Sequence, residues 1–353
     1  MRRKLQRLLM LVTGLCLLTG AALAAPGGGS SKGTAAQVKS GAFVRMEETA
    51  LNKSKVQYPS EELTVPLTRP LIKSISNIVF AQVPSRGYDN VALKLDLLQP
   101  AGPKLKPAVV YVTGGGFINA NKDNGLQTRM DLAEAGFVVA SIEYRVAPTA
   151  TFPQPLEDVK AAVRYLRAHA EKFGIDKNHI GLLGGSAGGY LVGIAGTTNG
   201  LKQFDVGENL DQSSKVQAVV DLFGVSDLTK IGADYSPAVQ KLHESAGATE
   251  ALWLNGSPVF GGRDGGIKAN LAGAELANPL HYISAATPPF LLMHGTADTV
   301  VSPSQSDIFY HALREHGVEA SRYVVQGAKH GGNFWVQPEI SKLIVAFFEK
   351  HLK

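Results

Sequence analysis

A single cysteine, Cys16, is present among the 353 residues of the sequence. It lies in an N-terminal segment with the three parts of a secretory signal peptide: a basic start, a short apolar middle and the small-residue end Ala22-Leu23-Ala24. We therefore predict that residues 1–24 are a signal peptide cleaved after Ala24, and that the protein is exported to the periplasm or the extracellular space. The mature chain then lacks cysteine, which excludes disulfides, a thiol nucleophile and cysteine-based zinc sites.

The sequence also lacks a strong excess of charge once the predicted signal peptide is removed. The whole chain has a formal net charge of +5. The signal peptide contributes Arg2, Arg3, Lys4 and Arg7 and no acidic residue, so the mature chain has a net charge of +1 (5 − 4). No second long apolar run follows. We therefore predict no nucleic-acid partner and no stable membrane anchor. The sequence does not indicate an oligomeric state.

Two short regions are predicted between the signal peptide and one large domain. Residues 25–41 are rich in proline, glycine, serine and alanine, which is typical of a flexible linker. Residues 42–75 have an irregular pattern interrupted by prolines, and we predict an N-terminal extension that lies on the domain. The domain itself is predicted at residues 76–353, a length within the range of a single α/β domain that carries an insertion.

Strand and helix patterns alternate through this domain. The near-continuous apolar runs at 108–112 and 137–142 are typical of strands buried on both faces of a parallel sheet. Residues 156–173 have apolar side chains at the spacing of one helix face. We predict an opening hairpin of 77–83 and 91–98, further strands at 179–183, 216–223, 290–294 and 321–325, and helices from 187 and at 303–316 and 340–352. This order predicts an α/β fold with a mostly parallel, doubly wound sheet.

Residues 226–284 break the alternation. They contain many glycines and Trp253 but few regular repeats. A long insertion between two late strands is predicted to form a lid that shapes a substrate pocket, with Trp253 among the residues lining it. A disordered loop is the alternative.

Ser186 is the candidate nucleophile. It lies in Gly184-Gly185-Ser186-Ala187-Gly188, between an apolar strand-like run and a helix-forming stretch. This pattern is typical of a nucleophile elbow, a strained strand-to-helix turn that exposes the serine hydroxyl and needs glycine on both sides. A tight turn around a buried serine is the alternative.

A serine hydroxyl needs a base and a group that orients the base, and both are predicted here. Asp298 follows the strand-like run 290–294, and His330 follows the run 321–325. The order Ser186, Asp298, His330 is that of the α/β-hydrolase triad. Taken alone, an aspartate in a turn after a strand, such as Asp298, is more commonly a helix cap or part of an Asx turn than a catalytic residue. His294 is predicted to support the turn that carries Asp298. We assign cap, surface or lid positions to the weaker candidates Asp221, Asp227, His243 and His281.

Three consecutive glycines follow the buried run 108–112. Glycine lets backbone N–H groups turn toward a developing oxyanion, and we predict an oxyanion hole made by Gly115, Gly116 and the N–H of Ala187. A phosphate-binding loop is the rival interpretation, but no lysine or acidic partner follows at the required spacing. No cofactor and no metal ion are predicted.

From about Ser76 onward the chain resembles the α/β-hydrolase superfamily. Residues 113–116 are similar to the His-Gly-Gly-Gly motif, and residues 143–148 are similar to the Tyr-Arg-Leu-Ala-Pro stretch, of carboxylesterases of the hormone-sensitive-lipase type and their bacterial feruloyl and acetyl-xylan esterase relatives. Thr113 replaces the usual histidine. In that family the histidine braces the loop, so we expect a hydroxyl to substitute for it.

The resemblance implies an exported serine carboxylesterase that acts through an acyl-enzyme. The expected substrates are small-molecule or polysaccharide-linked esters, with short-chain, carbohydrate-linked or feruloyl acyl groups. A serine exopeptidase of the same fold is one alternative, although we identify no acidic pair in the lid to hold a peptide amine. A non-catalytic binding protein is the other, and the complete set of three catalytic side chains argues against it.

Overall fold

The computed structural model describes residue 61, residues 63–85 and residues 87–353. The chain divides into two units, Met1–Thr64 and Val65–Lys353, and the fold described below is that of the second. The predicted signal peptide, the predicted linker and the part of the predicted extension up to residue 60 lie outside the described residues.

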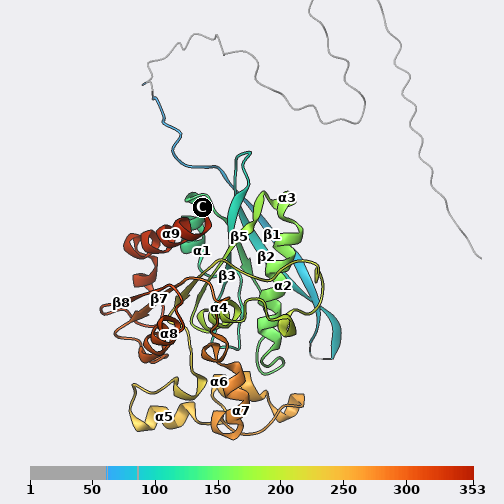
Figure 1. Ribbon diagram of the computed structural model, residues 1–353, viewed down its shortest axis with the longest axis vertical. Coiled ribbons are helices and arrows are strands. Elements are labelled where there is room, and N and C mark those ends of the chain that lie inside the picture. Colours follow the sequence, from blue (N-terminus) through green and yellow to red (C-terminus); the bar gives the residue numbers. More distant parts are fainter. Residues whose placement is uncertain (1–60, 62, 86) are drawn as a thin grey trace, which may run out of the picture. The chain divides into compact units, whose positions relative to one another are not determined.

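An eight-stranded sheet forms the centre of the second unit, in the order β1-β2-β4-β3-β5-β6-β7-β8 (Figure 1). The strands are β1 (Ile72–Ser85), β2 (Tyr88–Pro100), β3 (Lys106–Val112), β4 (Val138–Ile142), β5 (Ile175–Gly185), β6 (Ala218–Leu222), β7 (Phe290–Gly295) and β8 (Ala320–Val325). β1 pairs antiparallel with β2, and β2 antiparallel with β4, while the other pairs are parallel. The predicted hairpin and mostly parallel sheet are confirmed.

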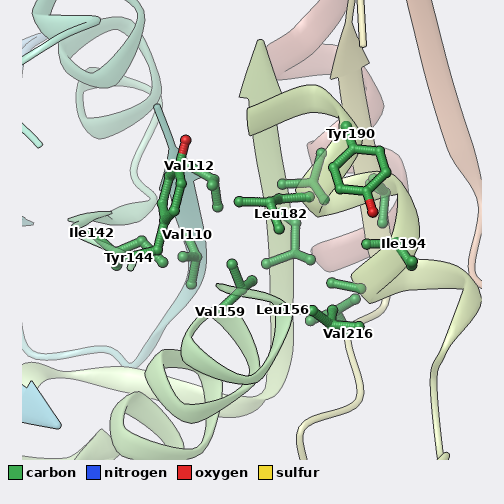
Figure 2. Close-up of a cluster of buried hydrophobic side chains, with 14 of the residues drawn as sticks. Val110, Val112, Ile142, Tyr144, Leu156, Val159, Leu182, Tyr190, Ile194 and Val216 are labelled. Carbon is green, nitrogen blue, oxygen red and sulfur yellow. The ribbon is translucent and has the colours of Figure 1, made fainter. Parts of the chain in front are cut away.

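Helices cover both faces of this sheet, which explains the continuous apolar runs of its strands. The helices are α1 (Leu126–Glu134), α2 (Gln154–Ala168), α3 (Ala170–Phe173), α4 (Ala187–Thr197), α5 (Pro237–His243), α6 (Thr249–Asn255), α7 (Leu271–Ala277), α8 (Ser304–Glu315) and α9 (Pro338–Leu352). Within β3, Val110 faces the core shared with α2, α4 and α8, and Val109 faces the core shared with α1 and α9. Figure 2 shows part of the first core, where Val110 lies near Leu182 of β5.

The boundaries differ from the prediction at two places. β1 begins at Ile72, inside the predicted extension, because Ile72 pairs with Pro100 of β2. The helix predicted at 156–173 is divided at His169, which separates α2 from α3. The Tyr165 carbonyl oxygen, in the last turn of α2, accepts a hydrogen bond from the His169 backbone N–H at 3.0 Å and lies 2.9 Å from the His169 ring nitrogen Nδ1.

The predicted insertion lies between β6 and β7 and is folded. It contains α5, α6 and α7, so the disordered-loop alternative is wrong. Trp253 of α6 is fully buried, with its ring centroid 4.7 Å from that of Phe117 and 5.6 Å from that of Tyr190. The prediction that Trp253 lines an open pocket is therefore wrong, since the side chain anchors the insertion to the domain. Its role as a lid stays a prediction.

Topology brings the predicted functional loops to one edge of the sheet. β3, β5, β7 and β8 run parallel, so the loops that follow them leave from the same side. These loops carry the glycine-rich run, Ser186, Asp298 and His330. Among the described residues, no helix is both long and apolar enough to cross a membrane.

Candidate active site

Ser186 occupies a strained turn between β5 and α4. Its φ of 58° and ψ of −125° are an unusual combination for a residue with a side chain, at a cost of about 1–3 kcal/mol. A Cβ on Gly184 would lie 2.3 Å from the Gly188 carbonyl oxygen, and a Cβ on Gly188 would lie 2.0 Å from the Val112 carbonyl oxygen. The Ser186 N–H donates to the Leu222 carbonyl at 2.9 Å. This is the geometry of the predicted nucleophile elbow.

Ser186, His330 and Asp298 form a continuous hydrogen-bonded chain. His330 Nε2 lies 2.7 Å from Ser186 Oγ, and His330 Nδ1 lies 2.8 Å from Asp298 Oδ2. An ionised carboxylate only accepts, so Nδ1 carries the ring proton, and Nε2 is then the acceptor for the serine hydroxyl. The structure thus brings the three predicted side chains together in the arrangement that nucleophilic catalysis requires.

The carboxylate of Asp298 is buried and held at both oxygens. Oδ1 accepts hydrogen bonds from the N–H groups of Val300 at 2.8 Å and Val301 at 3.0 Å. Burial raises the pKa of the Asp298 carboxyl. Hydrogen bonds from His294 and His330 lower it by a larger amount, so the pKa lies well below its usual range. Asp298 is therefore ionised when it orients His330. Its Asx-turn contacts and its contact with His330 occur together, so the two sequence interpretations are compatible.

A second histidine, His294, contacts the Asp298 carboxylate. Its Nε2 lies 3.2 Å from Asp298 Oδ2 and 3.1 Å from the Val301 carbonyl oxygen. Both neighbours are acceptors, so Nε2 carries the proton. Nδ1 is buried and has no hydrogen-bond partner within the described part of the chain. His294 thus holds the acid turn, where the sequence analysis placed it.

The glycine-rich loop lies directly against the elbow. A Cβ on Gly114 would lie 2.7 Å from the Gly185 carbonyl oxygen, so the two backbones approach more closely than a side chain allows. The N–H groups of Gly115, Gly116 and Ala187 donate to no acceptor in the residues described by the structure. Ala187 also begins α4, where the helix dipole favours negative charge. These donors are available to an oxyanion.

Thr113 braces the glycine-rich loop with its backbone and side chain. It is buried, its carbonyl accepts a hydrogen bond from the Tyr144 hydroxyl at 2.9 Å, and its Oγ1 accepts one from the Asn124 amide at 3.3 Å. Thr113 Oγ1 also donates to the Gly114 carbonyl at 3.1 Å. Thr113 therefore holds the glycine-rich loop in place through these hydrogen bonds, as expected of the residue that replaces the usual histidine.

The weaker sequence candidates lie outside the hydrogen-bonded chain. Asp227 caps the 3₁₀ turn that follows it and accepts from the Thr229 N–H at 3.0 Å. Asp221 is buried beneath the elbow, where its Oδ1 accepts from the Gly224 N–H at 2.9 Å and burial raises the pKa of its carboxyl to about 7. In the insertion, His243 pairs with Glu250 and His281 with Glu275.

Two residues that contact the triad were missed by the sequence analysis. The ring of Phe223, which follows β6, packs edge-on against the His330 ring with centroids 4.9 Å apart. Tyr235 of the insertion donates its hydroxyl to the Asp298 carbonyl oxygen at 3.2 Å. Neither lies in a motif, and only the fold brings them to the site. No group of three or more potential metal-ligating side chains occurs among the described residues.

Comparison with known proteins identifies the family. Residues 95–313 match the family model named BD-FAE. The chain belongs to the BD-FAE family. The matched segment contains the glycine-rich loop, the elbow and the acid loop, and it ends before His330. The α/β-hydrolase resemblance predicted from the motifs is confirmed by this match and by the relatives and solved structures described next.

Relatives of this BD-FAE family member include esterases. It is 31% identical over 210 residues to the probable carboxylic ester hydrolase LipM of Mycobacterium tuberculosis, an alignment of 59% of this chain and 45% of that protein. The chain spans about half the length of the first curated relatives it matches: 45%, 58% and 48%.

Solved structures resemble the BD-FAE family member over more of its length. One is a truncated form of a carbohydrate esterase from gut microbiota, with a TM-score of 0.68, 28% identity, and coverage of 81% of this chain and 98% of that one. Another is an acetyl ester-xyloside bifunctional hydrolase from Caldicellulosiruptor lactoaceticus, with a TM-score of 0.59, 26% identity, and coverage of 74% and 88%.

Proposed function

We propose that the protein is an exported serine carboxylesterase that hydrolyses acyl esters through an acyl-enzyme. One observation carries the proposal: Ser186, His330 and Asp298 are joined by hydrogen bonds of 2.7 and 2.8 Å beside N–H groups that have no acceptor in the described residues. The relatives named as esterases support the same reaction class.

Acylation begins at the Ser186 hydroxyl. Oγ attacks the ester carbonyl carbon while His330 Nε2 accepts the hydroxyl proton, and the carbonyl oxygen becomes an oxyanion. The N–H groups of Gly115, Gly116 and Ala187 stabilise that charge, each contributing on the order of 3 kcal/mol. His330 then donates the proton to the leaving alcohol oxygen as the carbon–oxygen bond breaks, which leaves the acyl group on Ser186.

Deacylation repeats the same proton movements with water. His330 Nε2 accepts a proton from water, whose oxygen attacks the acyl carbon, and the oxyanion forms again at the same donors. Collapse breaks the bond to Ser186 Oγ, and the proton on His330 returns to the serine. Asp298 stays ionised throughout because its low pKa lies far from neutral pH, and its charge stabilises the imidazolium in both half-reactions.

Carbohydrate-linked acyl esters are the substrates we favour. The gut-microbiota neighbour is named a carbohydrate esterase and the Caldicellulosiruptor neighbour an acetyl ester-xyloside hydrolase. The proposed export, inferred from the predicted signal peptide, would bring the protein to acylated polysaccharides outside the cytoplasm.

A substrate panel tests the reaction class. Aryl esters of graded acyl length, acetylated oligosaccharides, a feruloyl ester and aminoacyl anilides are compared under identical conditions. The proposal expects hydrolysis of esters, and a loss of roughly 10⁵- to 10⁶-fold in kcat in Ser186→Ala with unchanged circular dichroism. Hydrolysis of the anilides but not of the esters would instead favour the exopeptidase alternative, and no hydrolysis of any substrate would favour a binding protein.

A further inference from the structure

Phe223 has a strained backbone conformation next to the predicted catalytic base. It is the first residue after β6, and its φ of 47° lies in the left-handed region, which a bulky side chain rarely adopts. The Phe223 N–H donates to the Met293 carbonyl at 2.7 Å, so the turn stays hydrogen-bonded to β7. Strain of this kind persists only where neighbouring residues impose it, and it is concentrated at functional sites. The strained backbone therefore indicates a function for the ring that it carries.

A buried carboxyl group imposes this conformation. Asp221 Oδ1 accepts a hydrogen bond from the Gly224 N–H at 2.9 Å, which closes the turn around Phe223. The carboxyl group packs between Gly224 and Gly189 of α4, where an added Cβ on either glycine would lie 2.3 Å from Asp221 Oδ1. The turn is thus held between β6 and the first turn of α4, and Phe223 has little freedom to relax.

The Phe223 ring contacts both the elbow and the histidine. It packs edge-on against the His330 ring, with centroids 4.9 Å apart and an angle of 64° between the ring planes. Its tip lies beside Gly185, the residue before Ser186, where an added Cβ would be 3.2 Å from Phe223 Cζ. The carbonyl of Leu222, the preceding residue, accepts the Ser186 N–H at 2.9 Å. The ring therefore joins the elbow to the histidine by direct contact.

A second aromatic side chain holds the histidine loop against Phe223. Trp335, in the 3₁₀ turn Asn333–Val336, is buried, and its ring centroid lies 4.5 Å from that of Phe223. The indole N–H of Trp335 donates to the carbonyl of Lys329 at 2.9 Å, one residue before His330. Both the backbone and the ring of the histidine loop are thus held with respect to the same phenyl group.

We propose that Phe223 is a positioning residue that sets the distance between the Ser186 hydroxyl and the His330 ring. Ser186 Oγ lies 2.7 Å from His330 Nε2, although the two residues are 144 positions apart in the chain. A misplacement of about 1 Å at such a contact can cost about 10²-fold in rate. Phe223 acts through His330 and not on the substrate, so its loss should slow the hydrolysis of every ester by the same factor. The kinetic part of this inference rests on the proposed esterase function.

Kinetics of matched variants test the positioning role. Phe223→Leu removes the ring and is compared with Phe137→Leu. Phe137 is a buried phenylalanine immediately before β4, at the end of the parallel strands opposite the elbow. On aryl esters from acetate to octanoate, Phe223→Leu should lower kcat/KM by one common factor of roughly 10- to 100-fold. Phe137→Leu should keep the wild-type kcat/KM. Unchanged kcat/KM in Phe223→Leu, or a factor that depends on acyl length, would overturn the proposal.

A second variant, Gly185→Ala, perturbs the same contact and leaves Phe223 in place. The new methyl lies 3.2 and 3.3 Å from two atoms of the Phe223 ring, and its next neighbour, the Leu222 carbonyl oxygen, is at 3.7 Å. The ring must then shift by a few tenths of an ångström. This shift should lower kcat/KM roughly 3- to 10-fold. Gly185→Ala should cost nothing further in Phe223→Leu protein, which has room for the methyl. Additive losses in this double-mutant cycle, or an unchanged kcat/KM in Gly185→Ala, would contradict the proposal.

A measurement without turnover separates this inference from the proposed function. His330 Nδ1 carries the proton that it donates to Asp298 at 2.8 Å. With isotopically labelled histidine, this N–H gives a proton NMR signal that His330→Ala identifies by its loss. The signal should disappear in Phe223→Leu, because the freed ring exchanges its proton with water, and should persist in Phe137→Leu.

Loss of the signal in Phe223→Leu alone supports the positioning role even if the wild type hydrolyses no ester. A persistent signal in Phe223→Leu, together with ester hydrolysis at the wild-type rate, contradicts the positioning role and leaves the esterase proposal standing.

Discussion

Replacing Asp298 by asparagine tests how the acid orients the base. The N–H groups of Val300 and Val301 both donate to Oδ1, so the amide oxygen of asparagine must take that position. The amide NH₂ then replaces Oδ2 and faces His330 Nδ1 at about the observed 2.8 Å. A donor at this position obliges Nδ1 to accept, and the ring proton moves to Nε2. In that tautomer His330 no longer accepts the Ser186 proton.

The expected loss in kcat is about 10³- to 10⁴-fold, which corresponds to roughly 4–5 kcal/mol of transition-state stabilisation. The assay is hydrolysis of an aryl acetate at neutral pH, with the loss smaller than that of Ser186→Ala. Asp307→Asn is the matched control and should keep wild-type kcat, because Asp307 is a half-exposed carboxylate on α8 that pairs with Arg322 at 3.1 Å. If Asp298→Asn retained more than about a tenth of wild-type kcat, the assigned role of Asp298 would be wrong.

Three further predictions concern the surroundings of the triad. His294→Leu removes the second hydrogen-bond donor to Asp298 and should lower kcat about 10-fold or more. His294→Gln keeps an amide N–H that can donate to the same carboxylate, so it should recover most of the lost kcat. Equal kcat in the two variants would contradict the role of His294 as a donor to Asp298. Asp221 has a pKa raised to about 7 by burial, so the folded state binds its proton more tightly than the unfolded state, and stability falls as pH rises from about 4 to 7. Asp221→Asn should therefore raise the free energy of unfolding, measured in urea, by roughly 4 kcal/mol at pH 8 and by roughly 1.5 kcal/mol at pH 5, and an equal change at both pH values would refute the argument. Gly188→Ala should lower the melting temperature and abolish ester hydrolysis, because the new Cβ meets the Val112 carbonyl oxygen at 2.0 Å; a folded, active variant would show that the elbow tolerates a side chain there.

The parts of the site that follow strand ends were predictable from the sequence. Ser186, Asp298 and His330 each come after a predicted strand and each lies in a turn rich in small residues. Parallel strands bring such turns to one edge of a sheet, so chain order alone was enough to propose their contact. The hydrogen bonds of the structure join the same three side chains.

The contacts that depend on the insertion were not predictable. Tyr235 reaches Asp298 only because the insertion folds back onto the acid loop, and no local pattern marks that return. Trp253 has the size and position expected of a pocket residue, yet it is buried because Phe117 and Tyr190 offer aromatic faces. The division of the helix predicted at 156–173 lies at His169, whose φ of −109° and ψ of 22° leave the helical region, and the apolar spacing does not mark that change.

Covalent labelling tests the central claim, that Ser186 is the nucleophile of an acyl-enzyme. An aryl phosphonate is incubated with the wild type, Ser186→Ala and His330→Ala, and the modified peptide is identified by mass spectrometry. The account predicts one phosphonyl group per chain on Ser186 in the wild type, none in Ser186→Ala, and greatly slowed labelling in His330→Ala. A label on another residue, or a Ser186→Ala protein that keeps more than about one per cent of wild-type ester hydrolysis, would contradict it.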